Sequence, residues 1–293
     1  MANKGRALKG RIRSVQNTKK ITKTMELVST SKMKRAQDRV AAARPYAAAL
    51  AEVIGDLWTP ELAEQFALLK QPAPPTKGGP TRVSLILITS NRGLCGAFNG
   101  NLIKEARRRI EALEARGYSV DLHCVGRKGA GYFKYLGRPL ASDRSDIGDS
   151  PTSAHAASVV GPLIDDFAAG RIAGVEMVQA RFQSALSTPP LLVKVLPIAP
   201  PARTGRRPDY ILKPDAATIL ESLLPLYVRN LVYRGLAETA ASEHAARRTA
   251  MKNATDNATE IVQLLTRVYN RNRQAVITQE IAEIVGGAAA LEG

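Results

Sequence analysis

Aromatic residues are scarce in this sequence, because Phe, Trp and Tyr together make up only 5% of its 293 residues. A large compact globule normally uses more rings to fill its centre. Helices that pack through Ala, Leu, Ile and Val need few of them. Apolar residues as a whole reach 45%, an ordinary share for a folded protein. The composition therefore favours long packed helices over one large globular core.

Long apolar runs are also absent, and none reaches the roughly 18 residues of a membrane-spanning helix. The best candidate, residues 83–89, has the length of a strand. The basic N-terminus is not followed by the apolar segment of a secretory signal. These absences lead us to expect a bacterial-type cytoplasmic protein.

Residues that bind metals or carry out catalysis are few. The two cysteines, Cys95 and Cys124, have no CxxC spacing, and the three histidines belong to no cluster with ligand spacing. No Ser-His-Asp order stands out, and His244 is expected to be packed rather than catalytic. We therefore expect no catalytic residue, no metal site and no cofactor.

Acidic residues are nearly missing from the N-terminal segment. Residues 1–44 contain 13 Lys or Arg but only two acids, Glu26 and Asp38, which leaves this segment with most of the net charge of +16. A positive stripe of this density requires an acidic partner, which could be nucleic acid, anionic lipid or an acidic protein surface.

The first 57 residues read as one helix, because no cluster of Gly and Pro interrupts them. Pro45 is expected to kink this helix. Upstream, Lys19 and Thr22 interrupt the apolar spacing. The 3-4 spacing of a coiled-coil seam connects Met33, Ala36, Val40, Ala43, Ala47, Leu50, Ile54 and Leu57.

A mixed α/β region follows a linker at residues 58–80, whose second half is rich in Pro and Gly. Within residues 81–200 we expect strands at 82–90, 118–126, 174–182 and 191–200. Helices are expected at 101–116, 127–136 and 153–168, whereas the polar stretch 142–153 is left unassigned. Strands that alternate with helices predict a small doubly wound, Rossmann-like α/β domain.

A second helical run is expected at residues 215–293, after a loop at 201–214. Its seam should begin with Met251, Ala254, Ala258, Ile261, Leu265 and Val268. A polar belt at residues 270–274 separates this seam from a shifted apolar stripe that begins at Ile277. Together with the first helix, this run predicts a long antiparallel coiled coil.

The second helix should be longer than the first. At 1.5 Å per residue, the two helices would span roughly 80 Å and roughly 115 Å. If both leave the α/β domain together, residues 268–291 have no partner in the chain. An exposed apolar stripe invites aggregation, so we expect other subunits to surround it.

A glycine-rich stretch at residues 89–101, TSNRGLCGAFNGN, lies where a strand should turn into a helix. A phosphate cradle at a helix N-terminus is one interpretation. The stretch does not spell GxGxxG, and no Gly-Lys-Ser/Thr follows it. A tight turn that packs strand against helix is the favoured interpretation.

Three blocks of the sequence resemble the gamma subunit of the F-type ATP synthase. They are IRSVQNTKKITKTMELVSTSKMKRAQ at residues 12–37, SNRGLCGAFN at 90–99, and SEHAARRTAMKNATDNATEIVQLLTRVYNRNRQAVITQEIAEIVGGAAAL at 242–291. The order of the flanking elements agrees as well, so the resemblance covers essentially the whole chain.

The resemblance implies a central rotor shaft that transmits torque between a proton-driven membrane ring and the catalytic beta subunits. The chain itself would be a non-catalytic subunit without a cofactor. Its partners would be a ring of alpha and beta subunits, the epsilon subunit and the membrane ring of c subunits. It would lie at the bacterial inner (plasma) membrane as a peripheral protein of the cytoplasmic side, without nucleic acid.

By position, the resemblance also implies two sets of contact residues. Contacts of the foot with the rotor ring and epsilon would involve Tyr210 and Lys213. Coupling contacts to the alpha and beta subunits would be made by Lys20, Lys23, Met25, Arg247, Arg273, Gln274, Thr278 and Glu280.

Two other functional classes remain open from the residues alone. A basic coiled coil could bind nucleic acid, with an affinity that falls steeply with salt. An enzyme could instead bind a dinucleotide on the α/β domain, which titration of common dinucleotides would reveal.

Overall fold

The computed structural model describes residues 2–73, 81–199 and 215–292. The chain divides into two compact units. One unit combines residues 1–28 with residues 248–293, and the other comprises residues 29–247. Two long helices contribute to both units, so we describe each unit by itself.

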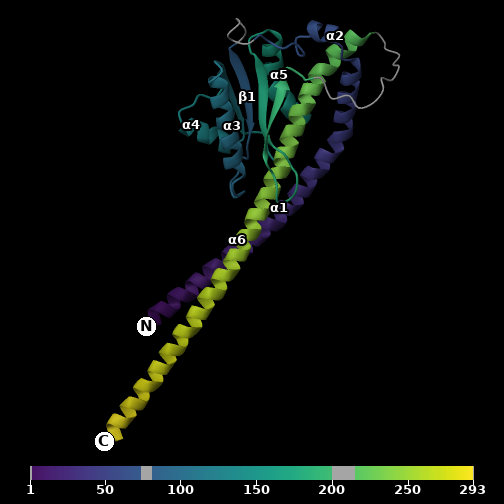
Figure 1. The fold of residues 1–293 in the computed structure, drawn as a ribbon. Helices are drawn as coiled ribbons and strands as arrows, with labels where there is room; N and C mark the ends of the chain where they lie inside the picture. The colour runs from purple at the N-terminus through teal and green to yellow at the C-terminus, as the bar shows by residue number, and fades with distance from the viewer. Residues whose placement is uncertain (1, 74–80, 200–214, 293) are drawn as a thin grey trace. The chain divides into compact units, whose positions relative to one another are not determined.

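The N-terminal helix α1, Ala2–Leu57, comprises 56 residues (Figure 1). It continues through Pro45, which cannot donate a backbone hydrogen bond. In the larger unit its buried residues are Ala36, Val40, Ala47, Leu50, Ile54 and Leu57. All six belong to the predicted seam. The 3-4 spacing of small and branched apolar residues therefore located the packed face of this half of the helix.

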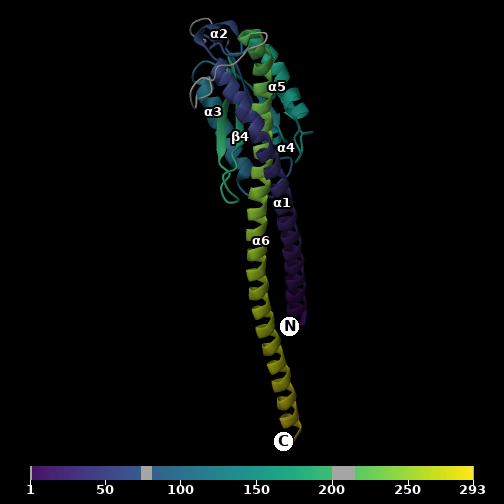
Figure 2. The ribbon, with the colours of Figure 1, turned by 90° about the vertical axis from the view of Figure 1, so that its right-hand side faces the viewer.

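The C-terminal helix α6, Ala216–Glu292, comprises 77 residues and continues through Pro225. In the smaller unit it lies beside α1 and runs antiparallel to it, as both views of the ribbon show (Figures 1 and 2). A buried hydrogen bond fixes their register, because the hydroxyl oxygens of Thr22 and Thr255 lie 2.8 Å apart. The predicted antiparallel coiled coil is confirmed.

The seam of this unit differs from the prediction by one position on α6. Ile261 and Val268, both predicted to face the seam, are exposed, whereas Val262 and Tyr269 are half-buried. Thr255 takes the place in the seam that the prediction gave to Ala254. The apolar pattern was misleading here because the seam accepts polar and small residues while Ile261 and Val268 point outward.

The seam of α1 was also misjudged. Lys19 and Thr22 were predicted to interrupt it, yet Thr22 is buried and Lys19 is half-buried. With Leu8, Ile12 and Val15 they form one continuous half-buried stripe. The hydroxyl pair of Thr22 and Thr255 explains how a polar position lies inside a helix seam at no large cost.

The part of α6 without a mate is shorter than predicted. Ala2 lies 20 residues before Thr22, whereas Glu292 lies 37 residues after Thr255. Counting outward from that contact, α1 ends opposite residue 275, so about 17 residues of α6 extend beyond it instead of the whole of 268–291. The length estimate failed because the helices do not leave the α/β domain at the same level.

A five-stranded sheet forms the centre of the larger unit, with strand order β3-β2-β1-β4-β5. The strands are β1 Arg82–Ile88, β2 Ser119–Val125, β3 Ser142–Arg144, β4 Gly174–Ala180 and β5 Pro190–Leu196. The first four run parallel, and β5 joins β4 antiparallel at the edge. β1 is buried over six of its seven residues, as a central parallel strand should be.

Helices cover both faces of this sheet, which confirms the predicted doubly wound domain. The helices α3, Phe98–Glu114, and α4, Arg127–Tyr135, pack on the face that carries Leu85 and Leu87. The other face, with Ile86 and Ile88, packs against α5, Ser153–Ala168, and against α1 and α6. The period-two alternation along β1 thus divides the domain into two cores.

Two short elements were not expected from the sequence. Helix α2, Pro60–Gln65, lies in the predicted linker and begins at Thr59, whose side chain accepts a hydrogen bond from the Leu62 amide. Strand β3 lies in the stretch 142–153 that received no assignment. Within the described ranges, no helix is long and apolar enough to cross a membrane.

Candidate functional site

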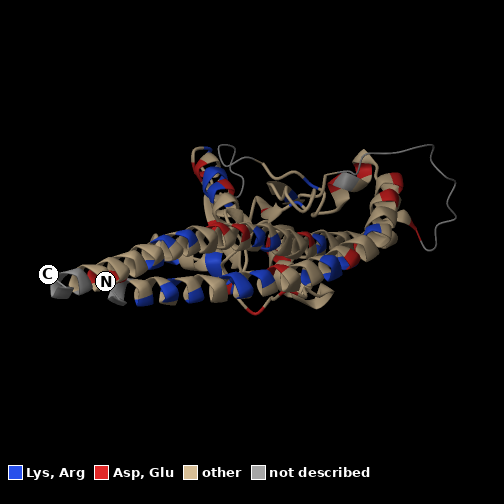
Figure 3. Cartoon of the chain, turned by 90° about the horizontal axis from the view of Figure 1, so that it is seen from below, with Lys and Arg blue, Asp and Glu red and all other residues tan. Residues whose placement is uncertain are grey.

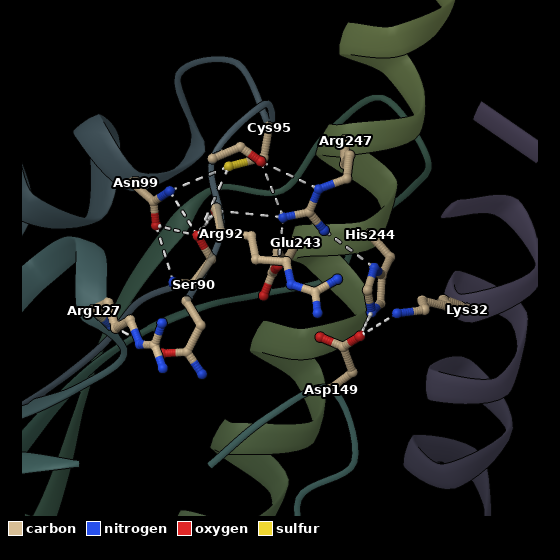
Figure 4. A network of polar contacts seen from close by, with 12 residues as sticks. Lys32, Ser90, Arg92, Cys95, Asn99, Arg127, Asp149, Glu243, His244 and Arg247 are labelled. Atoms are coloured by element: carbon tan, nitrogen blue, oxygen red, sulfur yellow. Dashed lines mark hydrogen bonds and ion pairs between the residues drawn. The ribbon is translucent and has the colours of Figure 1, made fainter. Parts of the chain in front are cut away.

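A network of polar side chains lies where β1 ends, and Arg247 of α6 is at its centre (Figure 4). Its guanidinium forms a 2.6 Å ion pair with Glu243, one helical turn earlier. It also donates to the backbone carbonyl of Gly93 at 3.3 Å. Arg247 and Glu243 are both buried. A buried, paired guanidinium of this kind fastens a helix to a loop.

The loop that Arg247 contacts connects β1 to α3 and contains the glycine-rich stretch. Ser90 bonds to the Asn99 side chain through its amide at 3.0 Å, and its hydroxyl donates to the Arg92 carbonyl. Leu94 adopts a positive φ of 63° with its side chain exposed. The stretch is therefore a tight turn tied to α6, as the favoured interpretation of the sequence held.

Asp149 brings a second part of the chain into this network. Its carboxylate accepts a 2.5 Å hydrogen bond from Lys32 of α1. His244 of α6 places its Nε2 atom 3.8 Å from the same oxygen. Arg247 lies 3.3 Å from the Nδ1 atom of His244. Because a guanidinium can only donate, Nδ1 accepts and the ring carries its proton on Nε2, which faces Asp149.

Burial shifts the protonation of these groups in opposite directions. Burial lowers the pKa of His244 to about 4, although the charge of Asp149 works against this shift. Burial also raises the pKa of Glu243, and the paired Arg247 opposes that change. At Asp149 burial would raise the pKa, but the hydrogen bond from Lys32 and the nearby positive charge outweigh it and leave the pKa lowered. His244 is therefore neutral at physiological pH.

The coupling residues predicted on α1 lie in the smaller unit. Lys20 and Lys23 are exposed, and Met25 is half-buried. Lys23 forms a 3.1 Å ion pair with Glu26. An exposed pair of this kind contributes little stability, so Lys23 can exchange Glu26 for an acid on another molecule.

The coupling residues predicted near the C-terminus lie on the last turns of α6. Arg273, Gln274, Thr278 and Glu280 are all exposed. The Thr278 hydroxyl donates to the Gln274 carbonyl at 3.0 Å, which is a contact within the helix. Arg247 is separate from this group, because it is buried in the larger unit. Tyr210 and Lys213 lie outside the described residues.

Several members of the network were not found from sequence. Glu243 had a usable signal, since an acid four residues before an arginine on a helix forms an i,i+4 pair. Lys32, Arg39 and Asp149 had none, because their contacts join positions more than a hundred residues apart. No group of three or more His, Cys, Asp or Glu in the described part of the chain could hold a metal ion.

The fold and this network define a class of protein in which two long helices are fastened to a small doubly wound domain. A family model described as ATP synthase matches residues 4–291. The ATP synthase gamma chain of Gemmatimonas aurantiaca is 61% identical over 293 residues, which cover 99% of both chains. That of Frankia casuarinae is 41% identical over 300 residues, with the same coverage. The chain belongs to the ATP synthase gamma chain family.

Solved structures agree in fold. A chain from the mitochondrial ATP synthase of Euglena gracilis, solved with OSCP, F1 and the c-ring, superposes with a TM-score of 0.69 at 20% identity. The match covers 99% of this chain and 95% of that one. A chain from the rotor of the same enzyme gives 0.66 at 19% identity, covering 94% of this chain and 100% of that one. The two long helices and the sheet domain are thus those of a central-stalk subunit.

Proposed function

We propose that this chain is the central rotor shaft of an ATP synthase and transmits torque between the membrane c-ring and the catalytic beta subunits. The observation that carries the proposal is the distal part of α6. Beyond residue 275 it has no partner in this chain, and its apolar side chains are exposed. The exposed fractions are 45% for Ile277, 56% for Ile281, 71% for Ile284 and 62% for Val285.

A ring of alpha and beta subunits is the proposed cover for this stripe. Exposed apolar rows of this kind favour association with other proteins. A second row with 3-4 spacing, Ile261, Leu264 and Val268, lies on the outer face of α6 nearer the α/β domain. Apolar contact without directional bonds suits a helix that must turn inside its sleeve, because the hydrophobic effect does not depend on orientation.

The basic residues of α1 support an acidic partner (Figure 3). Lys20 and Lys23 are exposed on this helix and Met25 lies half-buried beside them. We assign them to contacts with an acidic segment of beta. Charge complementarity between two surfaces fixes their register.

The remaining assignments concern the rest of the complex. The chain would be non-catalytic, with ATP made on the beta subunits. Residues 1–57 and 215–293 would supply the shaft. Residues 81–200 would supply the foot, which contacts the c-ring and epsilon with the help of Tyr210 and Lys213. The chain would be peripheral to the bacterial inner (plasma) membrane, on its cytoplasmic side.

Two substitutions in the polar belt test the coupling role. Gln274→Leu and Arg273→Ala should each lower ATP-driven proton pumping in membrane vesicles relative to ATP hydrolysis, because both remove exposed polar groups that we assign to the surrounding subunits. Asn101→Leu, which changes an exposed helical amide in α3, is the matched control. Wild-type pumping per ATP in both belt variants would remove these residues from the mechanism.

Copurification tests the assembly. We expect one copy of this chain with three alpha and three beta subunits. Recovery of the chain as a stable monomer that never binds the ring would contradict the proposed function.

A further inference from the structure

The segment of residues 146–151, between β3 and α5, is held by contacts from three directions. Ile147 is buried in the core on one face of the sheet. The side-chain amide of Asn91, in the loop after β1, donates to the carbonyls of Ser145 at 3.2 Å and Ile147 at 2.9 Å. The α/β domain therefore fixes the start of this segment.

Helix α1 contacts the far end of the segment through two cations on one stripe. Lys32 bonds to the Asp149 carboxylate at 2.5 Å. Arg39, two turns later, donates to the Asp149 carbonyl at 3.0 Å and to the Ser150 hydroxyl at 2.9 Å. Residues seven apart lie on the same face of a helix. If α1 slid by one turn or rotated about its axis, these contacts would break together.

Helix α6 meets the same carboxylate from the other side (Figure 4). The Nε2 atom of His244 is buried without a hydrogen-bond partner and lies 3.8 Å from the Asp149 carboxylate. Three residues further along α6, Arg247 holds the carbonyl of Gly93 in the loop after β1. The two long helices are thus both referred to one loop of the sheet, α6 directly and α1 through residues 146–151.

We propose that Asp149 is a positioning residue that sets the angular position of α1 on the α/β domain, so that torque applied to this domain reaches α1 without slip. The inference rests on the proposed rotor function. Lys32 and Arg39 are the residues through which Asp149 acts. A hydrogen bond in which both partners are charged is roughly twice as strong as a neutral one, and its loss would shift the balance between held and slipped positions by about tenfold.

The test uses the assembled ATP synthase in membrane vesicles and measures ATP hydrolysis, ATP-driven proton pumping and the amount of complex. We expect Asp149→Asn and Lys32→Met each to lower pumping per ATP severalfold at unchanged complex content. The charge-swapped pair Lys32→Asp/Asp149→Lys should restore much of it. The control is Asp143→Asn, which removes the 2.6 Å ion pair with Lys134 inside the α/β domain and leaves α1 untouched.

Three outcomes would overturn the inference. Pumping per ATP could stay at the wild-type value in both single variants. Pumping, hydrolysis and complex content could fall together, which would mean that Asp149 only stabilises the fold. Both variants could fail to assemble, which would also assign the contact to folding. Failure of the proposed function would look different, because the wild-type chain itself would then not assemble with the ring.

Discussion

At the scale of single residues, the network at the end of β1 converts buried charge into fixed geometry. Arg247 and Glu243 compensate each other inside the protein, and the guanidinium uses its remaining donors on backbone carbonyls. Burying either charge alone would cost several kcal/mol. The pair is therefore a source of specificity for how α6 lies on the β1–α3 loop.

A double substitution separates pairing from burial. Arg247→Met should lower the free energy of unfolding by ~3–5 kcal/mol, because Glu243 is left buried and uncompensated. Arg247→Met/Glu243→Leu should lose less than the single variant, since no charge then remains in the site. Urea denaturation of the full chain measures both. A double variant less stable than the single one would show that the pair stabilises beyond compensation.

His244 gives the fold a dependence on pH. Burial lowers its pKa from 6.5 to about 4, so the ring is neutral in the folded chain. As pH falls below about 6.5 the unfolded chain takes up the proton first, and stability is lost until about pH 4. Between pH 7 and pH 5 this amounts to about 2 kcal/mol. Comparison of urea midpoints for wild type and His244→Gln isolates the effect, and an equal loss in both chains would refute it.

The residue scale is also where sequence reasoning reached least far. The i,i+4 spacing of Glu243 and Arg247 is readable, as is the packed character of His244. The contact of Lys32 with Asp149 joins residues 117 positions apart and depends on how α1 lies on the domain. Such contacts leave no local pattern, because neither residue sits in a periodic context that requires the other.

At the scale of elements, periodicity and punctuation carried most of the information. The seven-residue strand β1 and the glycine that ends α3 were both readable from short segments. The seam of α6 was misread by one position, since outward-facing Ile261 and Val268 match the apolar pattern better than Thr255. A helix with apolar residues on two faces leaves the choice of face to its partners, and a single sequence does not contain them.

Gly126, which precedes α4, is the element boundary with the strictest backbone requirement. Its φ is 102°, and a Cβ atom there would lie 2.2 Å from the Thr89 carbonyl oxygen. We expect Gly126→Ala to destabilise the chain by about 3 kcal/mol or more. The matched control is Gly131→Ala within α4, where a Cβ atom meets nothing within 4 Å. This control should be neutral or stabilise by up to ~1 kcal/mol. Thermal unfolding that ranks the two variants the other way would contradict the account.

At the scale of the whole molecule, the chain contains more apolar helix surface than it can cover by itself. The family explains this surplus, because a gamma chain is one part of a larger complex. Composition and element order were enough to recognise that organisation. The level at which α1 stops beside α6 was not, since it follows from the contact of Thr22 with Thr255.

The most direct test of the central claim asks whether other subunits cover the end of α6. Cysteine replaces Ile284 in the full chain, whose own cysteines are both buried, and its labelling by a maleimide is timed in the isolated chain and in the assembled complex. Tyr135→Cys, at an exposed position on α4, reports in parallel on the reagent itself. The account predicts rapid labelling of position 284 in the isolated chain and strong protection in the complex. Equal labelling rates in both states would contradict it.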